Sequence, residues 1–454
     1  MLLRRLLTTL KDGPAEELNL GAGTAFTVVV RVGSYALVAI AGIVVARALG
    51  AHDRGVYSLV TTIGLMFAAF AELGVSKAGT YFVGQKRYSF QEVTSNNLAW
   101  WLVISALWIA GCVAVGVIRP PFVPDALGWP HVVVFAIGGS LLLLFVFTTD
   151  LLITSGSLLG YNLIMFVESL ARTVLVVGGV VLLSFGIVGV LSAWLAGIGL
   201  AVLLAAYLLT KRAKLIPRVD LRGMRDQLSF GVRSNLGFIL QSANERLDVF
   251  LVAGIAGAAA LGHYAVAFGV AEVLWRIPFA LGAVFFPKVA ALDPESNADT
   301  AAATCRRALF IILLATLAML PAGRVLIGSL YGHEFLPAVT AFYILAPSAM
   351  LYTVFRVLGS SLAARGMPES AIYGGAVSVP VTIGLGLLLI PRLGIEGAAL
   401  TSIAAYGASA AVVLAMFVRV TGRSVWETLV INRDDISSSV DSARTLLARS
   451  EASG

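Results

Sequence analysis

Two glutamate–arginine pairs of the same design stand inside long apolar stretches of this chain. Glu168 precedes Arg172, and Glu272 precedes Arg276, each by four residues. On an α-helix this spacing places both side chains on one face, with the acid at the favourable N-terminal position. Three interpretations are open. Each glutamate neutralises its arginine, each holds a planar guanidinium that an anionic group can bind through two oxygens, or the pair joins neighbouring helices.

Other ionisable residues also fall in the apolar stretches, where an unpaired charge at mid-bilayer costs roughly 2.5–3.5 kcal/mol. The arginines number seven and the acids six, so net charge does not identify a cargo, but five of the arginines lie in the second half. An anionic cargo would therefore find its cations mainly there. The candidates for binding such an anion, which would be a lipid headgroup if the cargo is a lipid, are Arg31, Arg172, Arg233, Arg276 and Arg356, with Glu168 and Glu272 as their supporting ion pairs. For Arg31, snorkelling to the membrane surface is an equal interpretation.

A polar face follows the predicted seventh span. Arg233, Gly237, Gln241, Asn244 and Asp248 are spaced by three or four residues, which is one face of a helix. Polar groups in a span usually face the protein interior, so this face is expected to border a cleft, and the alternative is packing between helices. The amides of Gln241 and Asn244 are candidates for bonding the hydroxyl groups of a sugar.

Three acids are candidates for coupling transport to an ion. Glu72, Asp150 and Asp248 qualify because an unpaired acid in a membrane cavity titrates near neutrality. Cys112 and Cys305 fall in different halves, so neither a disulfide nor a metal site is predicted, and no cofactor is expected. No catalytic residue and no phosphate-binding glycine loop stands out.

The elements that must position these residues are membrane-spanning helices. Hydrophobic residues make up 59% of the chain and charged residues 13%, with a mean hydropathy of +0.92, whereas a soluble domain has about 25% charged residues. Twelve stretches have the length of roughly 20 residues that a helix needs to cross a bilayer. They lie near 26–49, 57–83, 97–118, 131–155, 161–184, 187–209, 231–254, 260–286, 308–329, 338–363, 371–390 and 395–418.

A weak internal repeat suggests that these spans form two similar halves. Gly50, Gly55 and Tyr57 recur as Gly257, Gly262 and Tyr264 at an offset of 207, and residues 186–189 recur as 394–397 at an offset of 208. Six spans per half give both halves the same orientation. The prediction is an all-α polytopic membrane protein with twelve transmembrane helices in two parallel six-helix lobes around a central cleft. Its parts are an N-terminal segment (1–25), a first lobe (26–210), a basic linker (211–228), a second lobe (229–419) and a polar tail (420–454).

The distribution of lysine and arginine orients the chain. With a cytoplasmic N-terminus, the inner segments hold 18 basic residues and the outer loops only Arg54, Arg119 and Arg392. This bias predicts cytoplasmic N- and C-termini, and it explains the net charge of +7 without a nucleic-acid partner. Met1–Leu10, with leucines beside Arg4 and Arg5, reads as a short helix on the inner membrane surface.

Short motifs in a characteristic order extend from about Leu20 to Val418. In the first half they are Arg47–Gly50, Gly55–Leu59 and Glu72–Ser76. In the second half they are Phe230–Gly231, Asn244–Asp248, Gly262–Tyr264, Phe286–Pro287, Tyr331–Phe335, Ile390–Gly394 and Gly397–Ala399. In their order and spacing they resemble the bacterial polysaccharide repeat-unit flippases of the multidrug/oligosaccharidyl-lipid/polysaccharide exporter superfamily.

The resemblance implies a flippase that moves a polyprenyl-pyrophosphate-linked oligosaccharide from the inner to the outer leaflet of a bacterial cell membrane by alternating access. It implies contact with membrane lipids and with a polysaccharide polymerase or glycosyltransferases of the same pathway. A cation-coupled exporter of drugs or metabolites is the alternative, which the aromatic residues Trp194, Tyr264, Phe268 and Trp275 leave open. A membrane enzyme is a third class, but the predicted outer loops are short for a catalytic site.

Overall fold

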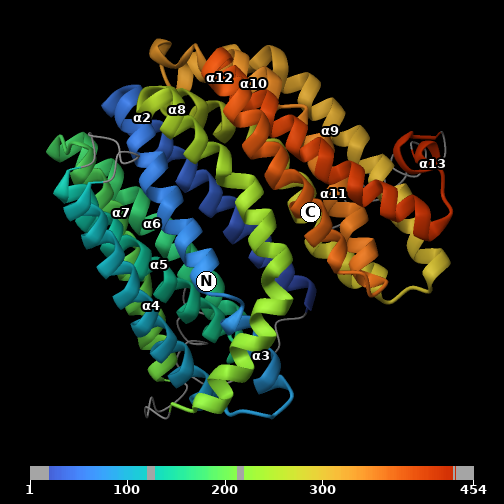
Figure 1. Ribbon diagram of the computed structural model, residues 1–454, viewed down its shortest axis with the longest axis horizontal. Helices are drawn as coiled ribbons and strands as arrows, with labels where there is room; N and C mark the ends of the chain where they lie inside the picture. The colour runs from blue at the N-terminus through green and yellow to red at the C-terminus, as the bar shows by residue number, and fades with distance from the viewer. Residues whose placement is uncertain (1–19, 120–127, 212–218, 433–434, 436–454) are drawn as a thin grey trace, which may run out of the picture. The chain divides into compact units, whose positions relative to one another are not determined.

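The chain is helical throughout the part that the computed structural model describes, which is residues 20–119, 128–211, 219–432 and 435 (Figure 1). No strand occurs among these residues, so the predicted all-α class is confirmed. The predicted interfacial helix at Met1–Leu10 lies outside the described residues, as does most of the basic stretch between 211 and 219.

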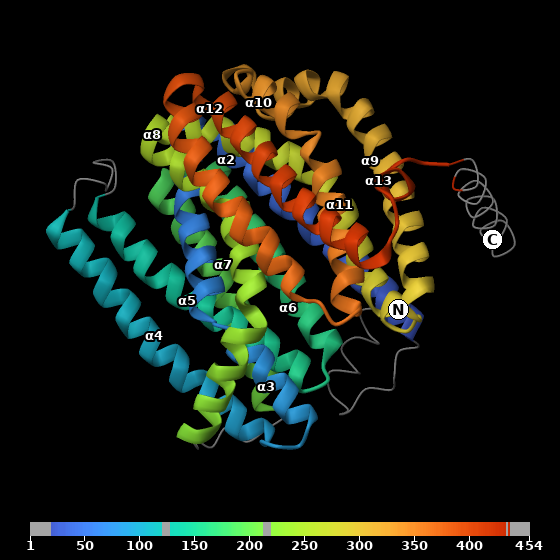
Figure 2. The same ribbon diagram turned by 45° about the vertical axis from the view of Figure 1, so that its right-hand side comes forward.

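The chain divides into two compact units, Met1–Leu236 (unit 1) and Gly237–Gly454 (unit 2). In Figures 1 and 2, unit 1 is coloured from blue to green and unit 2 from yellow-green to red. The boundary falls inside one 70-residue helix, α8 (Leu221–Ala290), whose first turns belong to unit 1. Those turns are fixed there because the Gln227 amide bonds with the side chains of Asn96 (3.0 Å) and Asn97 (3.2 Å).

The helices of unit 1 pack closely through small residues. Membrane helices associate in this way because lipid is as apolar as their side chains, so close packing takes the place of the hydrophobic effect. Its elements are α2 (Leu20–Ala71), α3 (Val75–Gly84), α4 (Phe90–Ile118), α5 (Trp129–Thr154), α6 (Leu158–Leu183), α7 (Ile187–Thr210) and the start of α8. A Cβ on Gly197 of α7 would lie 2.7 Å from the backbone of Arg172 on α6. Gly139 of α5 similarly accommodates the ring of Trp108 on α4. Glycine at these positions lets the helices approach and fixes where Arg172 stands.

The predicted second span, 57–83, is interrupted toward its C-terminal end. Leu73 and Gly74 both have positive φ angles (47° and 75°), which ends α2 and begins α3 in a new direction. Gly74 is required here because a Cβ would lie 2.4 Å from the Gly231 carbonyl oxygen. The first turns of α8 therefore pack against this break.

Unit 2 is built from the rest of α8 and six further elements, which are α9 (Pro294–Leu330), the 3₁₀ turn η1 (His333–Phe335), α10 (Ala338–Leu345), α11 (Ser348–Ala364), α12 (Glu369–Thr421) and α13 (Val425–Leu429). A core of buried apolar side chains joins α8, α9, α11 and α12, with Phe285, Leu358 and Phe417 among its members. Gly375 of α12 packs against Leu240 of α8, where a Cβ would meet the leucine Cβ at 2.6 Å. Close contact along these two helices positions the polar side chains of α8.

The repeated glycines occupy matching positions in the two units. Gly50 in α2 and Gly257 in α8 share nearly the same non-helical backbone, with φ 76° and ψ −177° against φ 85° and ψ 175°. Gly186 precedes α7, and Gly394 interrupts α12 with φ 60°. Each glycine marks a corner between two predicted spans, which is what a duplicated module requires.

Nine helices among the described residues are long and apolar enough to cross a membrane. Three of them, α2, α8 and α12, contain one of the non-helical glycines and run for 52, 70 and 53 residues. These helices are long enough for more than one crossing. The chain is thus a multi-pass membrane protein, and the count of twelve spans stays a prediction.

Candidate functional site

The first glutamate–arginine pair forms as its spacing predicts, within α6 of unit 1. Arg172 Nε lies 3.2 Å from Glu168 Oε1, and the side chains are only 18% and 10% exposed. Ser169 donates a second hydrogen bond to the glutamate at 3.2 Å. The ring of Tyr57, buried on α2, interacts electrostatically with both charges. This pair is enclosed within its own unit, and Arg172 Nε is held by the ion pair without a hydrogen bond of its own.

A second polar group in unit 1 surrounds the break in the second span. Glu72 accepts hydrogen bonds from the backbone N–H groups of Gly74 and Ser76, both at 2.9 Å, so it is a cap for α3 rather than an unpaired acid. Asn235 contacts Glu72 at 3.4 Å and accepts a bond of 2.7 Å from Lys77 Nζ. Asp150 of α5 interacts electrostatically with Glu72 and Lys77. The structure thus brings the candidates Glu72 and Asp150 together.

Two further arginine candidates of unit 1 are exposed. Arg31 of α2 donates a hydrogen bond of 3.4 Å to the hydroxyl of Tyr161 on α6. Arg233, in the first turns of α8, belongs to unit 1 and not to the second lobe in which it was predicted, because those turns are bonded to α4. Neither arginine is part of the group formed by Glu168 and Arg172.

In unit 2 the acid Asp248 of α8 is deeply buried, at 2% exposed. The hydroxyl of Tyr264 donates to it at 2.5 Å, the hydroxyl of Ser402 at 3.2 Å and the amide of Val249 at 2.8 Å. Three donors are what a buried carboxylate needs when no cation contacts it directly. Ser402 belongs to α12, so this hydrogen bond joins α8 to α12.

The amide residues of the predicted polar face also lie inside unit 2. Gln241 and Asn244 are 9% and 4% exposed, because α12 packs against this face of α8. Gln241 donates to Glu245 at 2.8 Å, and Asn244 accepts from Thr382 at 3.3 Å. Gln241 Oε1 and Asn244 Nδ2 nevertheless have no partner among the described residues. Each amide therefore keeps one buried group available, and the sugar-binding role stays a prediction.

The second glutamate–arginine pair differs from the first because two arginines share its acid. Glu272 Oε1 lies 2.8 Å from Arg276 Nη2 and 3.7 Å from Arg246 Nη2. Arg246 also lies over the ring of Phe268, with 5.2 Å from guanidinium carbon to ring centroid. The side chains are more open than in unit 1, with exposures of 26% for Glu272 and 40% for Arg276. Glu272 is therefore shared between two guanidinium groups, and Arg246 also interacts electrostatically with Glu245 and Asp248.

Arg356 of α11 has no carboxylate ion pair among the described residues. Its guanidinium lies over the rings of Phe279 (5.0 Å) and Tyr352 (6.0 Å), and its Nε is buried without a hydrogen-bond partner. Tyr352 stacks on Trp275 at 5.1 Å and donates to Glu245 at 3.4 Å. It also interacts electrostatically with Arg276. Tyr352 thus joins two candidate arginines, one of them lacking a counter-ion.

Several residues of these groups were not singled out from the sequence. Tyr352 and Ser402 were missed because their partners come from distant parts of the chain, for Ser402 and Asp248 a separation of 154 residues. Lys77 was also missed, because it falls near the end of a predicted span, yet it bonds to Asn235. A hydrogen-bonding residue type inside an apolar span was the available signal, and it does not name the partner.

Comparisons with known proteins agree with this architecture. No curated protein matches the sequence. An inward-facing multidrug resistance MATE family transporter of the MOP superfamily is 16% identical, with a TM-score of 0.70 over 86% of this chain and 94% of that one. The lipid II flippase MurJ in an inward closed conformation is 12% identical, with a TM-score of 0.74 over 87% and 89%. A MOP superfamily transporter from Pyrococcus furiosus is 16% identical, with a TM-score of 0.63 over 89% and 94%.

These structural similarities show a shared fold. The sequence itself matches the profile of a family described as "Polysaccharide biosynthesis protein" over residues 44–340, which is more than half of the chain. The match includes Glu168, Arg172, Asp248, Glu272 and Arg276. The chain therefore belongs to the polysaccharide biosynthesis protein family and has the fold of the MOP superfamily transporters.

Proposed function

We propose that this protein moves a polyprenyl-pyrophosphate-linked oligosaccharide from the inner to the outer leaflet of a bacterial cell membrane, by alternating access, for the synthesis of a surface polysaccharide. Membership of the polysaccharide biosynthesis family supports the pathway. The fold shared with a lipid II flippase supports transport of a lipid-linked precursor. In this proposal both termini are cytoplasmic, and a polymerase or glycosyltransferases of the same pathway supply or consume the cargo.

The proposal rests on the surroundings of Arg356, which has aromatic neighbours and no carboxylate partner among the described residues. An arginine within an apolar helix is costly unless an anion or water compensates it. The aromatic rings beneath Arg356 stabilise a cation but do not neutralise it. A diphosphate would bind through two oxygens at once to this planar group. Arg276 completes the proposed headgroup site, with Glu272 holding it when the cargo is absent.

A cation-coupled exporter of drugs or metabolites is the second candidate, and a specific feature of unit 2 favours it. Asp248, Tyr264 and Ser402 form a buried acid with hydroxyl partners, and Phe268 and Trp275 pack nearby with their ring centroids 5.2 Å apart. An acid beside aromatic rings suits a cationic or aromatic cargo. In that function Glu72, Asp150 or Asp248 would take up the coupling ion.

Lipid analysis of cells that lack the protein, together with their drug sensitivity, separates the two functions. The flippase predicts polyprenyl-linked oligosaccharide trapped on the cytoplasmic leaflet and loss of surface polysaccharide. Normal glycolipids with increased sensitivity to cationic drugs would instead establish the exporter. Complementation with Arg356→Lys against the wild type tests the headgroup site, because lysine keeps the charge and loses the planar fork.

A further inference from the structure

A short helix fixed at the C-terminal end of unit 2 exposes large apolar side chains. α12 ends at Thr421 and α13 begins at Val425. Trp426 is 76% exposed, and its neighbours Val425 and Val430 are 47% and 48% exposed. The opposite side of α13 is packed, since Thr428 is fully buried and Leu429 contacts the core of unit 2.

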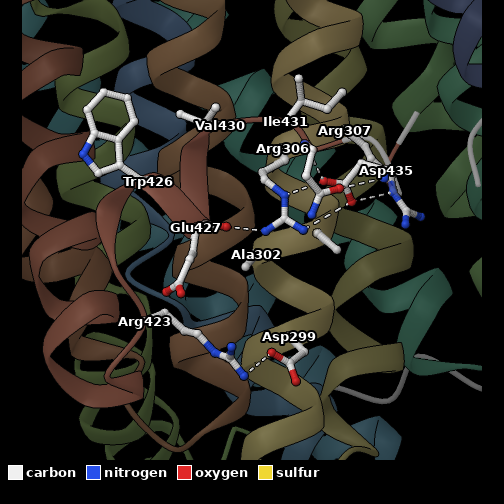
Figure 3. A pocket seen from close by; sticks show the side chains of 12 residues that line it. Asp299, Ala302, Arg306, Arg307, Arg423, Trp426, Glu427, Val430, Ile431 and Asp435 are labelled. Atoms are coloured by element: carbon white, nitrogen blue, oxygen red, sulfur yellow. Dashed lines mark hydrogen bonds and ion pairs between the residues drawn. The ribbon is translucent and has the colours of Figure 1, made fainter. Parts of the chain in front are cut away.

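α13 is held firmly, so the exposure of Trp426 does not come from a loose end. Ser424 and Glu427 form a capping box that closes the first turn. Arg306 of α9 donates to the Glu427 carbonyl oxygen and, through Nε at 2.5 Å and Nη2 at 3.2 Å, to Asp435 (Figure 3). These bonds orient α13 and the residues that follow it.

The Asp435 carboxylate that binds Arg306 stays charged at neutral pH. Burial acts to raise the pKa of this carboxyl, but the hydrogen bonds from Arg306 and the Asn432 amide outweigh it, and the pKa lies below its ordinary value. The stability that ionised Asp435 contributes is therefore present at neutral pH and is lost only as the pH falls through that lowered pKa.

A hollow of about 660 Å³ lies beside α13, lined by α9, Arg423 and Trp426 (Figure 3). Its three carboxylates are already engaged: Asp299 with Arg423, Glu427 in the capping box and Asp435 with Arg306 and Arg307. Arg423 reaches Asp299 through one Nη group only, and its side chain is 34% exposed. It also interacts electrostatically with Glu427, and Asp299 is its one ion-pair partner among the described residues.

Chain length limits where this helix can lie. Only Gly422, Arg423 and Ser424 separate the membrane-spanning α12 from α13, and three residues reach at most about 10 Å. α13 therefore stays at the membrane surface. Tryptophan is favoured in the boundary between headgroups and acyl chains, and an adjacent arginine is favoured beside lipid phosphates.

We propose that α13 is a membrane foot that binds an anionic phospholipid surface: Trp426, Val425 and Val430 enter the headgroup boundary, and Arg423 binds a lipid phosphate at the hollow. The site does not depend on the transported cargo. On the predicted orientation the surface is the inner leaflet. Because Arg423 pairs with Asp299 of α9, and Arg306 of α9 donates to the Glu427 carbonyl oxygen of α13, the foot fixes the ends of α9 and α12 to the same lipid surface.

Quenching of tryptophan fluorescence tests the foot in the full-length protein. The protein is placed in nanodiscs of phosphatidylcholine, or of phosphatidylcholine with phosphatidylglycerol, and one lipid at a time carries bromine near the glycerol end of its acyl chains. The emission of Trp426 is the difference between wild type and Trp426→Phe. We expect quenching by both brominated lipids, with brominated phosphatidylglycerol favoured about fivefold, which corresponds to ~1 kcal/mol for one arginine.

Arg423→Gln should abolish the preference for phosphatidylglycerol and leave the quenching by phosphatidylcholine. The matched control is Trp129→Phe, since Trp129 begins α5 in unit 1 and is 47% exposed. Its quenching should not respond to Arg423→Gln. If Trp426→Phe fails to fold, Trp426→Tyr gives the same subtraction.

Two results overturn the proposal. Quenching of Trp426 by aqueous iodide but by neither brominated lipid would place α13 in water or against another protein. Equal quenching by the two lipids in the wild type would remove the anionic-lipid preference proposed for Arg423. Both readouts are independent of transport, so they stand whether or not the flippase function is upheld.

Discussion

The two units hold glutamate–arginine pairs of identical spacing in different electrostatic settings. In unit 1, Glu168 and Arg172 face each other in an enclosed contact of 3.2 Å. In unit 2, Glu272 is divided between Arg276 and Arg246, and Arg356 nearby has aromatic rings but no carboxylate among the described residues. A buried pair of one acid and one arginine stabilises the fold. An arginine that shares its acid with a second arginine can still bind an anion. We therefore expect a structural role for the first pair and propose cargo binding for the second.

The largest expected effect on transport comes from Arg356. Arg356→Ala should lower the rate ~10–100-fold, the range expected when one or two charge-assisted hydrogen bonds to a phosphate are lost. Insertion and thermal stability should change little, because the side chain makes no ion pair to lose. Flipping of a fluorescent polyprenyl-pyrophosphate sugar in proteoliposomes measures the rate.

Arg172→Ala combined with Glu168→Ala is the matched control for Arg356. Removing both members of the closed pair should leave transport within a few-fold of the wild type. A transport loss equal to that of Arg356→Ala would contradict the assignment of the two units. The same logic applies within unit 2, where restored transport in Glu272→Ala with Arg276→Ala would show that this pair too is only mutual neutralisation.

Stability should respond in the opposite order. Glu168→Ala leaves Arg172 buried and unpaired, at a cost of about 3–5 kcal/mol in unfolding free energy. Glu272→Ala should cost less, because Arg276 is 40% exposed and solvent screens its charge. Thermal unfolding in detergent measures both. A larger loss of stability for Glu272→Ala would mean that the unit 2 pair is the structural one.

The sequence predicted what depends on neighbours along one helix. Both i, i+4 pairs formed, and the repeated glycines Gly50 and Gly257 lie at matching corners, because helical geometry and turn chemistry act locally. The apolar composition was enough to predict spanning helices. The family followed from the order of many weak motifs and not from any single site.

What the sequence did not predict depends on distant partners. Glu72 was expected as an unpaired acid, but the left-handed backbone at Leu73 starts a new helix whose N–H groups it caps. Leucine gives no sign of such a break. Arg356 could not be distinguished from Arg276 either. Arg276 pairs with Glu272 and Arg356 pairs with no described acid, and this difference depends on the folded structure. The burial of Gln241 and Asn244 on the polar face likewise depends on α12, which packs against that face.

The repeated tyrosines offer a smaller test of the same comparison. Tyr264 donates to buried Asp248, whereas the hydroxyl of Tyr57 bonds with no other described residue. Tyr264→Phe should destabilise unit 2 by ~1–3 kcal/mol, the cost of leaving a buried acceptor short of one donor, and Tyr57→Phe should be nearly neutral. The difference in unfolding midpoint between the two variants checks this. Equal effects would show that Ser402 and Val249 alone satisfy Asp248.

A last pair of substitutions should have equal effects in the two units. Gly50 and Gly257 hold positive φ angles of 76° and 85° with extended ψ, a conformation that other residues adopt only at a cost of ~1–3 kcal/mol. A Cβ at Gly257 would meet no neighbour within 4 Å, so backbone strain alone should set the cost of alanine there. Matched shifts in unfolding midpoint for Gly50→Ala and Gly257→Ala would support a duplicated corner. A shift confined to one variant would mean that the units diverged in their turns as well as in their charges.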